Sequence, residues 1–180
     1  MSDTKKALEA LFKGLKFSDF KWIDPESIVV SQWVRMKCRF GCPEYGQTAA
    51  CPPHVPSISE CERFFREYTL AVVFHFAKAM ERPEDRHAWT KRISEELLQL
   101  ERRVFLSGYR KAFLLYLDSC HLCGTCSGSD KPCFLPKQAR PTPEALGMDV
   151  FATVRQIGYP IEVLSDYDQT MNRYAFLLIE

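Results

Sequence analysis

The sequence predicts an α/β or α+β fold, in which one mixed β-sheet of about five strands is flanked by helices. Segments rich in β-branched and aromatic residues alternate with amphipathic segments along the chain, and this alternation is typical of layered sheet-and-helix domains. Of the 180 residues, 46% are hydrophobic, which is enough for one substantial core. Residues 1–180 are therefore expected to form a single domain.

Helices are expected where apolar periodicity follows a capping residue. An N-terminal helix falls within residues 1–16, and Ser57 and Glu60 form an S-x-x-E capping box before a second helix. Pro83 opens a long third helix, because proline is favoured in the first turn. Asp149 caps a fourth helix, since its carboxylate can accept hydrogen bonds from free backbone N–H groups.

Four segments have the composition of β-strands. They are IVVSQWVRMKC (28–38), TLAVVFHFA (69–77), KAFLLYLD (111–118) and RYAFLLIE (173–180). Two loops dense in cysteine, glycine and proline, residues 38–56 and 120–141, follow the first and third of these strands. Since sites in layered folds form at strand ends, we expect both loops at one edge of the same sheet.

Charge and hydropathy argue against two classes of partner. The formal net charge is +1, which removes the electrostatic case for nucleic acid as an obligate partner. No segment approaches the roughly 20 apolar residues of a membrane span, and the first residues lack the apolar run of a signal peptide. We therefore expect a cytoplasmic protein, whose eight cysteines are metal ligands, catalytic thiols or buried apolar residues rather than disulfides.

Four cysteines are concentrated in the second loop. Cys120, Cys123 and Cys126 form C-x2-C-x2-C, and Cys133 follows after six residues. The triplet has the spacing of bacterial-type ferredoxin loops, in which one short segment supplies several iron corners of a cubane. Structural zinc is an alternative, although zinc sites commonly use separated C-x2-C pairs, and free or redox-active thiols are another. The spacing favours a [4Fe-4S] cluster.

The first loop holds three further cysteines. Cys38, Cys42 and Cys51 form C-x3-C-x8-C, which leaves one corner of a cubane, or one position on zinc, without a cysteine. His54 could fill that position, or it could be an exposed loop histidine. Cys61 is a weaker candidate, because it lies on the apolar stripe of its helix, where cysteine behaves as a small hydrophobic residue. An open position could bind water, a small molecule or a partner's side chain.

The two loops together resemble a known family. The segments CRFGCPEYGQTAACPPHVPS and CHLCGTCSGSDKPCFLPKQARPTPEALGMDV resemble prokaryotic predicted metal-binding proteins classed as a domain of unknown function. That family typically has a C-R-x-G-C-x-x-Y-G-x4-C-P-P loop and a later C-x2-C-x2-C segment ending in R-P-x-x-E-A-x-G-x-D-V. The resemblance extends from Ile28 to the last strand, and Leu146 stands where some relatives have a cysteine. It implies a cytoplasmic metal or iron-sulfur protein with all seven loop cysteines as ligands, but it implies no reaction.

Seven cysteines divide as four plus three, so we expect two clusters, the second with a non-cysteine, external or missing fourth ligand. One larger cluster that uses both loops would fit the same count. The leading hypothesis is a [4Fe-4S] protein that transfers electrons or acts as a redox accessory to a partner enzyme. The first alternative is a redox or Lewis-acid enzyme that binds a small molecule at an open position of the Cys38/Cys42/Cys51 site. The second is a zinc-stabilised structural or interaction module.

Overall fold

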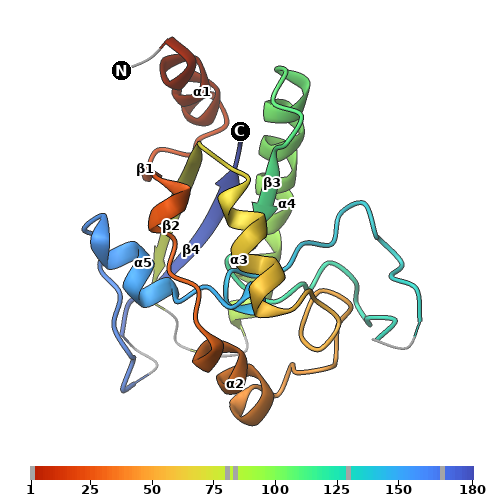
Figure 1. Cartoon of the computed structure of the whole chain (residues 1–180). Coiled ribbons are helices and arrows are strands. Elements are labelled where there is room, and N and C mark those ends of the chain that lie inside the picture. Colours follow the sequence, from red (N-terminus) through yellow and green to blue (C-terminus); the bar gives the residue numbers. More distant parts are fainter. Residues whose placement is uncertain (1–2, 80–81, 83–84, 129–130, 167–168) are drawn as a thin grey trace.

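An antiparallel β-sheet lies at the centre of the structure (Figure 1). The computed structural model describes residues 3–79, 82, 85–128, 131–166 and 169–180. Within these ranges the strands are β1 (Phe20–Ile23), β2 (Ala71–Lys78), β3 (Phe113–Leu115) and β4 (Met171–Leu178). They lie in the order β1-β2-β4-β3, and every neighbouring pair is antiparallel. The long strands β2 and β4 therefore form the middle of the sheet, and the short strands form its edges.

Helices cover both faces of this sheet. One buried cluster joins the sheet to α1 (Asp3–Gly14) and α4 (Asp85–Leu106), and the other joins it to α3 (Ile58–Arg66) and α5 (Val150–Gln156). Successive side chains of a strand point to opposite faces, so Val72 and Phe74 belong to the first cluster and Ala71 and Val73 to the second. Each large apolar side chain buried in this way contributes about 1.5–3 kcal/mol. The mixed helix-and-sheet class is confirmed, as an α+β domain.

Two predicted helix starts are confirmed by their hydrogen bonds. The Ser57 backbone N–H donates to the Glu60 carboxylate at 2.8 Å, and the Glu60 N–H donates to the Ser57 hydroxyl at 3.4 Å, which completes the capping box of α3. The Ala152 N–H donates to the Asp149 carboxylate at 2.9 Å at the start of α5. Caps of this kind contribute about 1 kcal/mol each.

The predicted strand at residues 28–38 is wrong over most of its length. Val30 is extended and forms an isolated antiparallel bridge, but the chain then turns into α2 (Gln32–Gly41). Val34 and Cys38 share one face under either interpretation, because their spacing of four residues suits both a strand and a helix. The first cysteine loop therefore begins in the last turn of a helix, rather than at the end of a strand.

The sheet also differs from the prediction in size and direction. The described residues form four strands rather than about five, and the sheet is antiparallel rather than mixed. Strand β1 was not predicted, because it has four residues that are mostly half-buried and it depends on pairing with β2. The predicted strands at 69–77, 111–118 and 173–180 correspond to β2, β3 and β4. The predicted helix start at Pro83 lies outside the described residues.

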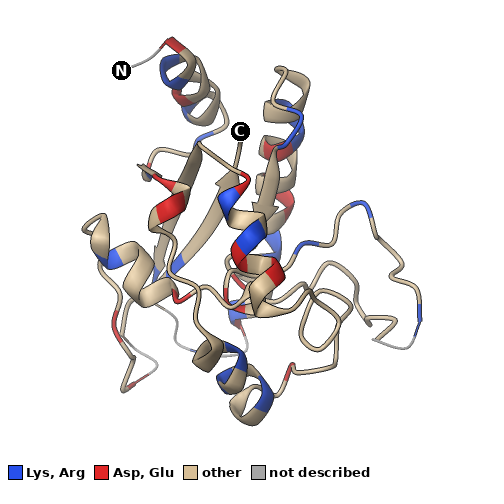
Figure 2. Ribbon diagram, in the orientation of Figure 1, with Lys and Arg blue, Asp and Glu red and all other residues tan. Residues whose placement is uncertain are grey.

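Charged residues are distributed unevenly among the helices (Figure 2). Helices α1, α3 and α4 carry both acidic and basic residues, whereas α2 carries Arg35, Lys37 and Arg39 and no acidic residue. Of the described helices, none is both long and apolar enough to span a membrane.

The second cysteine loop is anchored to the core where it returns to the sheet. The Arg140 guanidinium binds the buried Glu101 carboxylate through two hydrogen bonds of 2.8 and 3.0 Å, and Glu101 also accepts the Leu114 backbone N–H at 2.8 Å. The Tyr116 hydroxyl donates to the Gln138 carbonyl at 2.6 Å. These contacts tie the loop to α4 and β3 and fix its position at one end of the sheet.

Candidate metal centre

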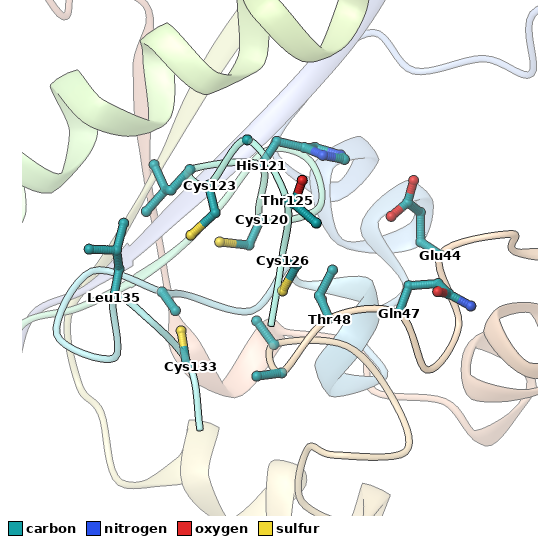
Figure 3. Close-up of a pocket in the computed structure, with 15 residues that line it drawn as sticks. Glu44, Gln47, Thr48, Cys120, His121, Cys123, Thr125, Cys126, Cys133 and Leu135 are labelled. Carbon is teal, nitrogen blue, oxygen red and sulfur yellow. The ribbon is translucent and has the colours of Figure 1, made fainter. Parts of the chain in front are cut away.

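The four cysteines of the second loop face one cavity. Cys120, Cys123, Cys126 and Cys133 line a space of about 280 Å³, and Figure 3 shows their sulfur atoms turned toward it. Residues 47–50 of the first loop also line this cavity. The structure therefore brings together two segments that are about seventy residues apart in the chain.

Cys120 connects this cavity to the hydrophobic core. Its side chain and that of Leu135 pack against the buried cluster on the α1 and α4 side of the sheet. Burial raises the pKa of the Cys120 thiol, and a hydrogen bond from the Leu122 backbone partly offsets this effect. In the metal-free protein the thiol is therefore protonated at neutral pH, and a metal group that binds it must displace the proton.

The other three cysteines of the predicted site line a second cavity, of about 210 Å³. Cys38 lies in α2 and Cys42 is the C-cap of that helix, so their i, i+4 spacing places them next to each other on one side of the helix. Cys51 follows in the loop and is buried, whereas Cys42 is exposed. This cavity therefore has a buried end at Cys51 and a solvent-exposed end at Cys42.

The thiols of the second cavity resist ionisation in the absence of a metal. Burial raises the pKa of Cys51 to about 11, with smaller contributions from neighbouring negative charge. Burial also raises the pKa of Cys38, and the nearby Cys42 and Glu144 add to the effect. A cationic metal group would reverse this balance, since it stabilises the thiolate form that binds it.

Charged residues that the sequence did not single out line the second cavity as well. Asp118 follows β3, Glu144 begins the short 3-10 helix η2 (Glu144–Leu146), and Arg173 lies in β4. Burial raises the pKa of Glu144. Asp118 directly ends a predicted strand and Glu144 lies in the R-P-x-x-E-A segment, so both had a sequence signal, whereas Arg173 had none.

His54 and Cys61 lie elsewhere. Both line a third, mostly apolar cavity of about 480 Å³, which Cys133 also borders. Neither is among the residues that line the three-cysteine cavity. Cys61 is 1% exposed and belongs to the core cluster around α3, as expected from its position on the apolar stripe of its helix.

Glu44 connects the two cysteine cavities. It lies in the first loop and lines both the four-cysteine and the three-cysteine cavity. The residues on either side of Cys120 line different cavities. Asp118 and Ser119 line the three-cysteine cavity, and His121 lines the four-cysteine cavity. The two cysteine sets are therefore separate but adjacent.

The residues present fit metal groups that are bound by thiolates. Each cavity is bordered by a complete set of loop cysteines, four in one case and three in the other. Beside Cys126, the Ser127 hydroxyl is buried and has no hydrogen-bond partner among the described residues. Such a donor suits the sulfur atoms of a bound cluster, whose potential responds to hydrogen bonds.

Residues 21–179 match the family described as "Predicted metal-binding protein (DUF2284)". Searches of curated proteins and of solved structures found no match. The matched range includes every cysteine of both cavities.

Proposed function

Because the chain belongs to this family of predicted metal-binding proteins, we propose that it is an iron-sulfur protein of the cytoplasm that transfers single electrons to a partner protein. Cys120, Cys123, Cys126 and Cys133 hold a [4Fe-4S] cluster, and the three-cysteine cavity holds a second cluster with one non-cysteine position. The observation that carries the proposal is the grouping of all seven cysteines around two adjacent cavities.

The spacing of the thiols favours a cluster over a single zinc ion. Four thiolates on one zinc converge at Zn–S distances of about 2.3 Å. Among the described residues, which include every cysteine, no three thiols lie within 4.8 Å of one another. Four thiols spread around a cavity suit a group with four separate corners, and such a group supplies reversible one-electron chemistry when bound.

The three-cysteine cavity supports a second centre of different character. Its three thiols leave one position for another ligand, and Glu144 offers a carboxyl group on the same cavity wall. Arg173 adds a cation there, which can hold an anion beside the centre. The chain thus provides both a ligand of its own and a place for a small molecule at this position.

An apolar stripe on α2 favours electron transfer as the function. Trp33, Met36 and Phe40 recur on one helical face and are 51%, 45% and 75% exposed, while Cys38 on the same helix lines the second cavity. Exposed patches of this kind are typical of interaction surfaces. Lys37 flanks the stripe and is exposed, so the partner that fits best is a small acidic electron carrier.

The arrangement of Glu144 and Arg173 favours a second candidate function. A carboxyl group and a guanidinium beside an incomplete metal centre could bind and polarise an anionic substrate, as in a redox or Lewis-acid enzyme. A spectral change of the three-cysteine centre on addition of small anions or thiols would support this candidate over simple electron transfer.

The experiment that tests the proposal is the metal and acid-labile sulfide content of protein purified without oxygen, measured together with its visible and EPR spectra. We expect about eight irons with matching sulfide per chain. Zinc without sulfide would overturn the proposal and leave a zinc-stabilised module. Cys61→Ala is the matched control, because this cysteine lies in the core and should leave the iron content unchanged.

A further inference from the structure

Two histidines and a glutamate meet beside the cysteine cavities. Glu44 comes from the first loop, His87 from the first turn of α4 and His121 from the second loop. One ring nitrogen of each histidine and one carboxylate oxygen of Glu44 lie within 4.8 Å of one another. Three elements that are distant in sequence are needed to assemble this group, which is why sequence inspection did not single it out.

The local contacts leave metal-binding atoms free. His87 Nδ1 is buried and has no hydrogen-bond partner among the described residues. His121 Nε2 lies 3.1 Å from the Ser119 hydroxyl, which can orient the ring as second partners of metal-bound histidines do. The two imidazole rings are 4.0 Å apart between centroids. An unpartnered buried nitrogen normally costs stability, and a bound ion would remove that cost.

The surrounding charges suit a divalent cation. The Arg86 guanidinium lies 3.4 Å from His87 Nε2, but it is paired with Asp118 at 2.9 Å, so Glu44 supplies the formal negative charge of the group. Two imidazoles and one carboxylate are a set used by mononuclear iron(II) and by catalytic zinc sites, which keep further positions open.

We propose that Glu44, His87 and His121 bind one divalent transition-metal ion that is separate from the two cysteine centres. Glu44 lines both cysteine cavities and His121 lines the larger one, so the ion lies where the two cavities meet. Its remaining positions are open to water or to a small oxygen ligand. The proposal holds whether the cysteines bind iron-sulfur clusters or zinc, because it uses none of their thiols.

The test is a manganese(II) titration of the anaerobically purified whole chain with its cysteine centres loaded, followed by the EPR signal of free Mn²⁺. Manganese is the probe because it prefers oxygen and nitrogen donors to thiolates. We expect one bound ion per chain, displaced by Zn²⁺. His87→Ala and Glu44→Gln should each weaken binding by about tenfold or more, and His54→Ala, which removes a histidine outside the group, should not.

Two results would overturn this site. One is equal binding of Mn²⁺ and of Zn²⁺ by the wild type, His87→Ala and Glu44→Gln. The other is that these variants lose cluster iron and sulfide as well as Mn²⁺ binding, which would make the three residues part of a cysteine centre. If circular dichroism shows that His87→Ala does not fold, the titration of the loop variant Glu44→Gln decides whether the site exists. If the cysteines hold zinc and the chain still binds one Mn²⁺ ion, the proposed function is refuted but this site is not.

Discussion

The two cysteine cavities differ in how each one is built. The four-cysteine cavity takes all its thiols from residues 120–133 of one loop. The three-cysteine cavity takes two thiols from the end of α2 and one from the following loop, and its remaining wall comes from β4, η2 and the residues after β3. The first is therefore a local structure placed against the core, whereas the second exists only when distant elements have assembled.

This difference suggests a division of labour under the proposed function. A complete set of four cysteine ligands suits an electron store with no open position. A set of three thiols beside Asp118, Glu144 and Arg173 suits a centre that responds to ligands. The exposed Cys42 end of the second cavity and the apolar stripe of α2 then place that centre closer to a partner.

Removal of cysteines should have the largest effect and should show whether the cavities hold separate centres. Cys123→Ser combined with Cys126→Ser should lower the iron content from about eight to about four per chain, because the three-cysteine cavity is untouched. Cys38→Ser combined with Cys51→Ser should remove the other half. Iron and sulfide analysis of anaerobic protein measures both, and loss of all iron in either variant would point to one larger cluster.

The second largest effect should come from loss of the Arg140 anchor, which should destabilise the part of the protein that holds the four-cysteine cavity. Arg140→Ala leaves the Glu101 carboxylate buried without its cation, which should cost about 3 kcal/mol of unfolding free energy. Urea unfolding of the anaerobic protein measures this. Arg92→Ala is the matched control, on the helix α4 that also carries Glu101, since the exposed Arg92–Glu96 pair contributes at most about 1 kcal/mol. Equal effects of the two variants would show that Arg140 does not anchor the loop.

Acidification should release the metal groups from both cysteine cavities. Cys51 has a pKa of about 11 in the absence of metal, so its thiol is protonated at neutral pH and the metal group competes with a proton for the sulfur. Each thiol of this kind weakens apparent binding about tenfold for every pH unit of decrease. Iron retained after incubation between pH 8 and pH 5 measures this release, and full retention of iron at pH 5 would contradict it.

Changes on the α2 surface should have the smallest effect and should leave both centres filled. Lys37→Glu and Phe40→Ser should slow electron transfer to a small acidic flavoprotein severalfold, with the Lys37 effect fading at high salt. Stopped-flow reduction kinetics measure the rate. Lys13→Glu, an exposed change on α1, makes the same charge change elsewhere. Slowing of equal size in this control would remove α2 as the docking surface.

Several elements of the fold were predictable because their signals are local. The caps at Ser57 and Asp149 depend on residues three positions apart, and the central strands β2 and β4 are apolar on both faces. The grouping of four cysteines follows from their spacing alone, since all four lie in the second loop. The error at residues 28–38 has a local cause as well, since a four-residue apolar spacing fits both a strand and a helix.

The sequence by itself determined the helix-and-sheet class, the principal caps and the identity of the cysteine-rich loops, because each depends on neighbours within one or two turns. Only the tertiary structure decided that α2 is a helix, that β1 joins the sheet, and that two loops meet beside β3. It also decided which polar residues gather beside the cysteine cavities: Glu44, His87 and His121 in one group, and Asp118, Glu144 and Arg173 in another. These groups form through long-range packing, and no local pattern encodes contacts between residues so far apart in the chain.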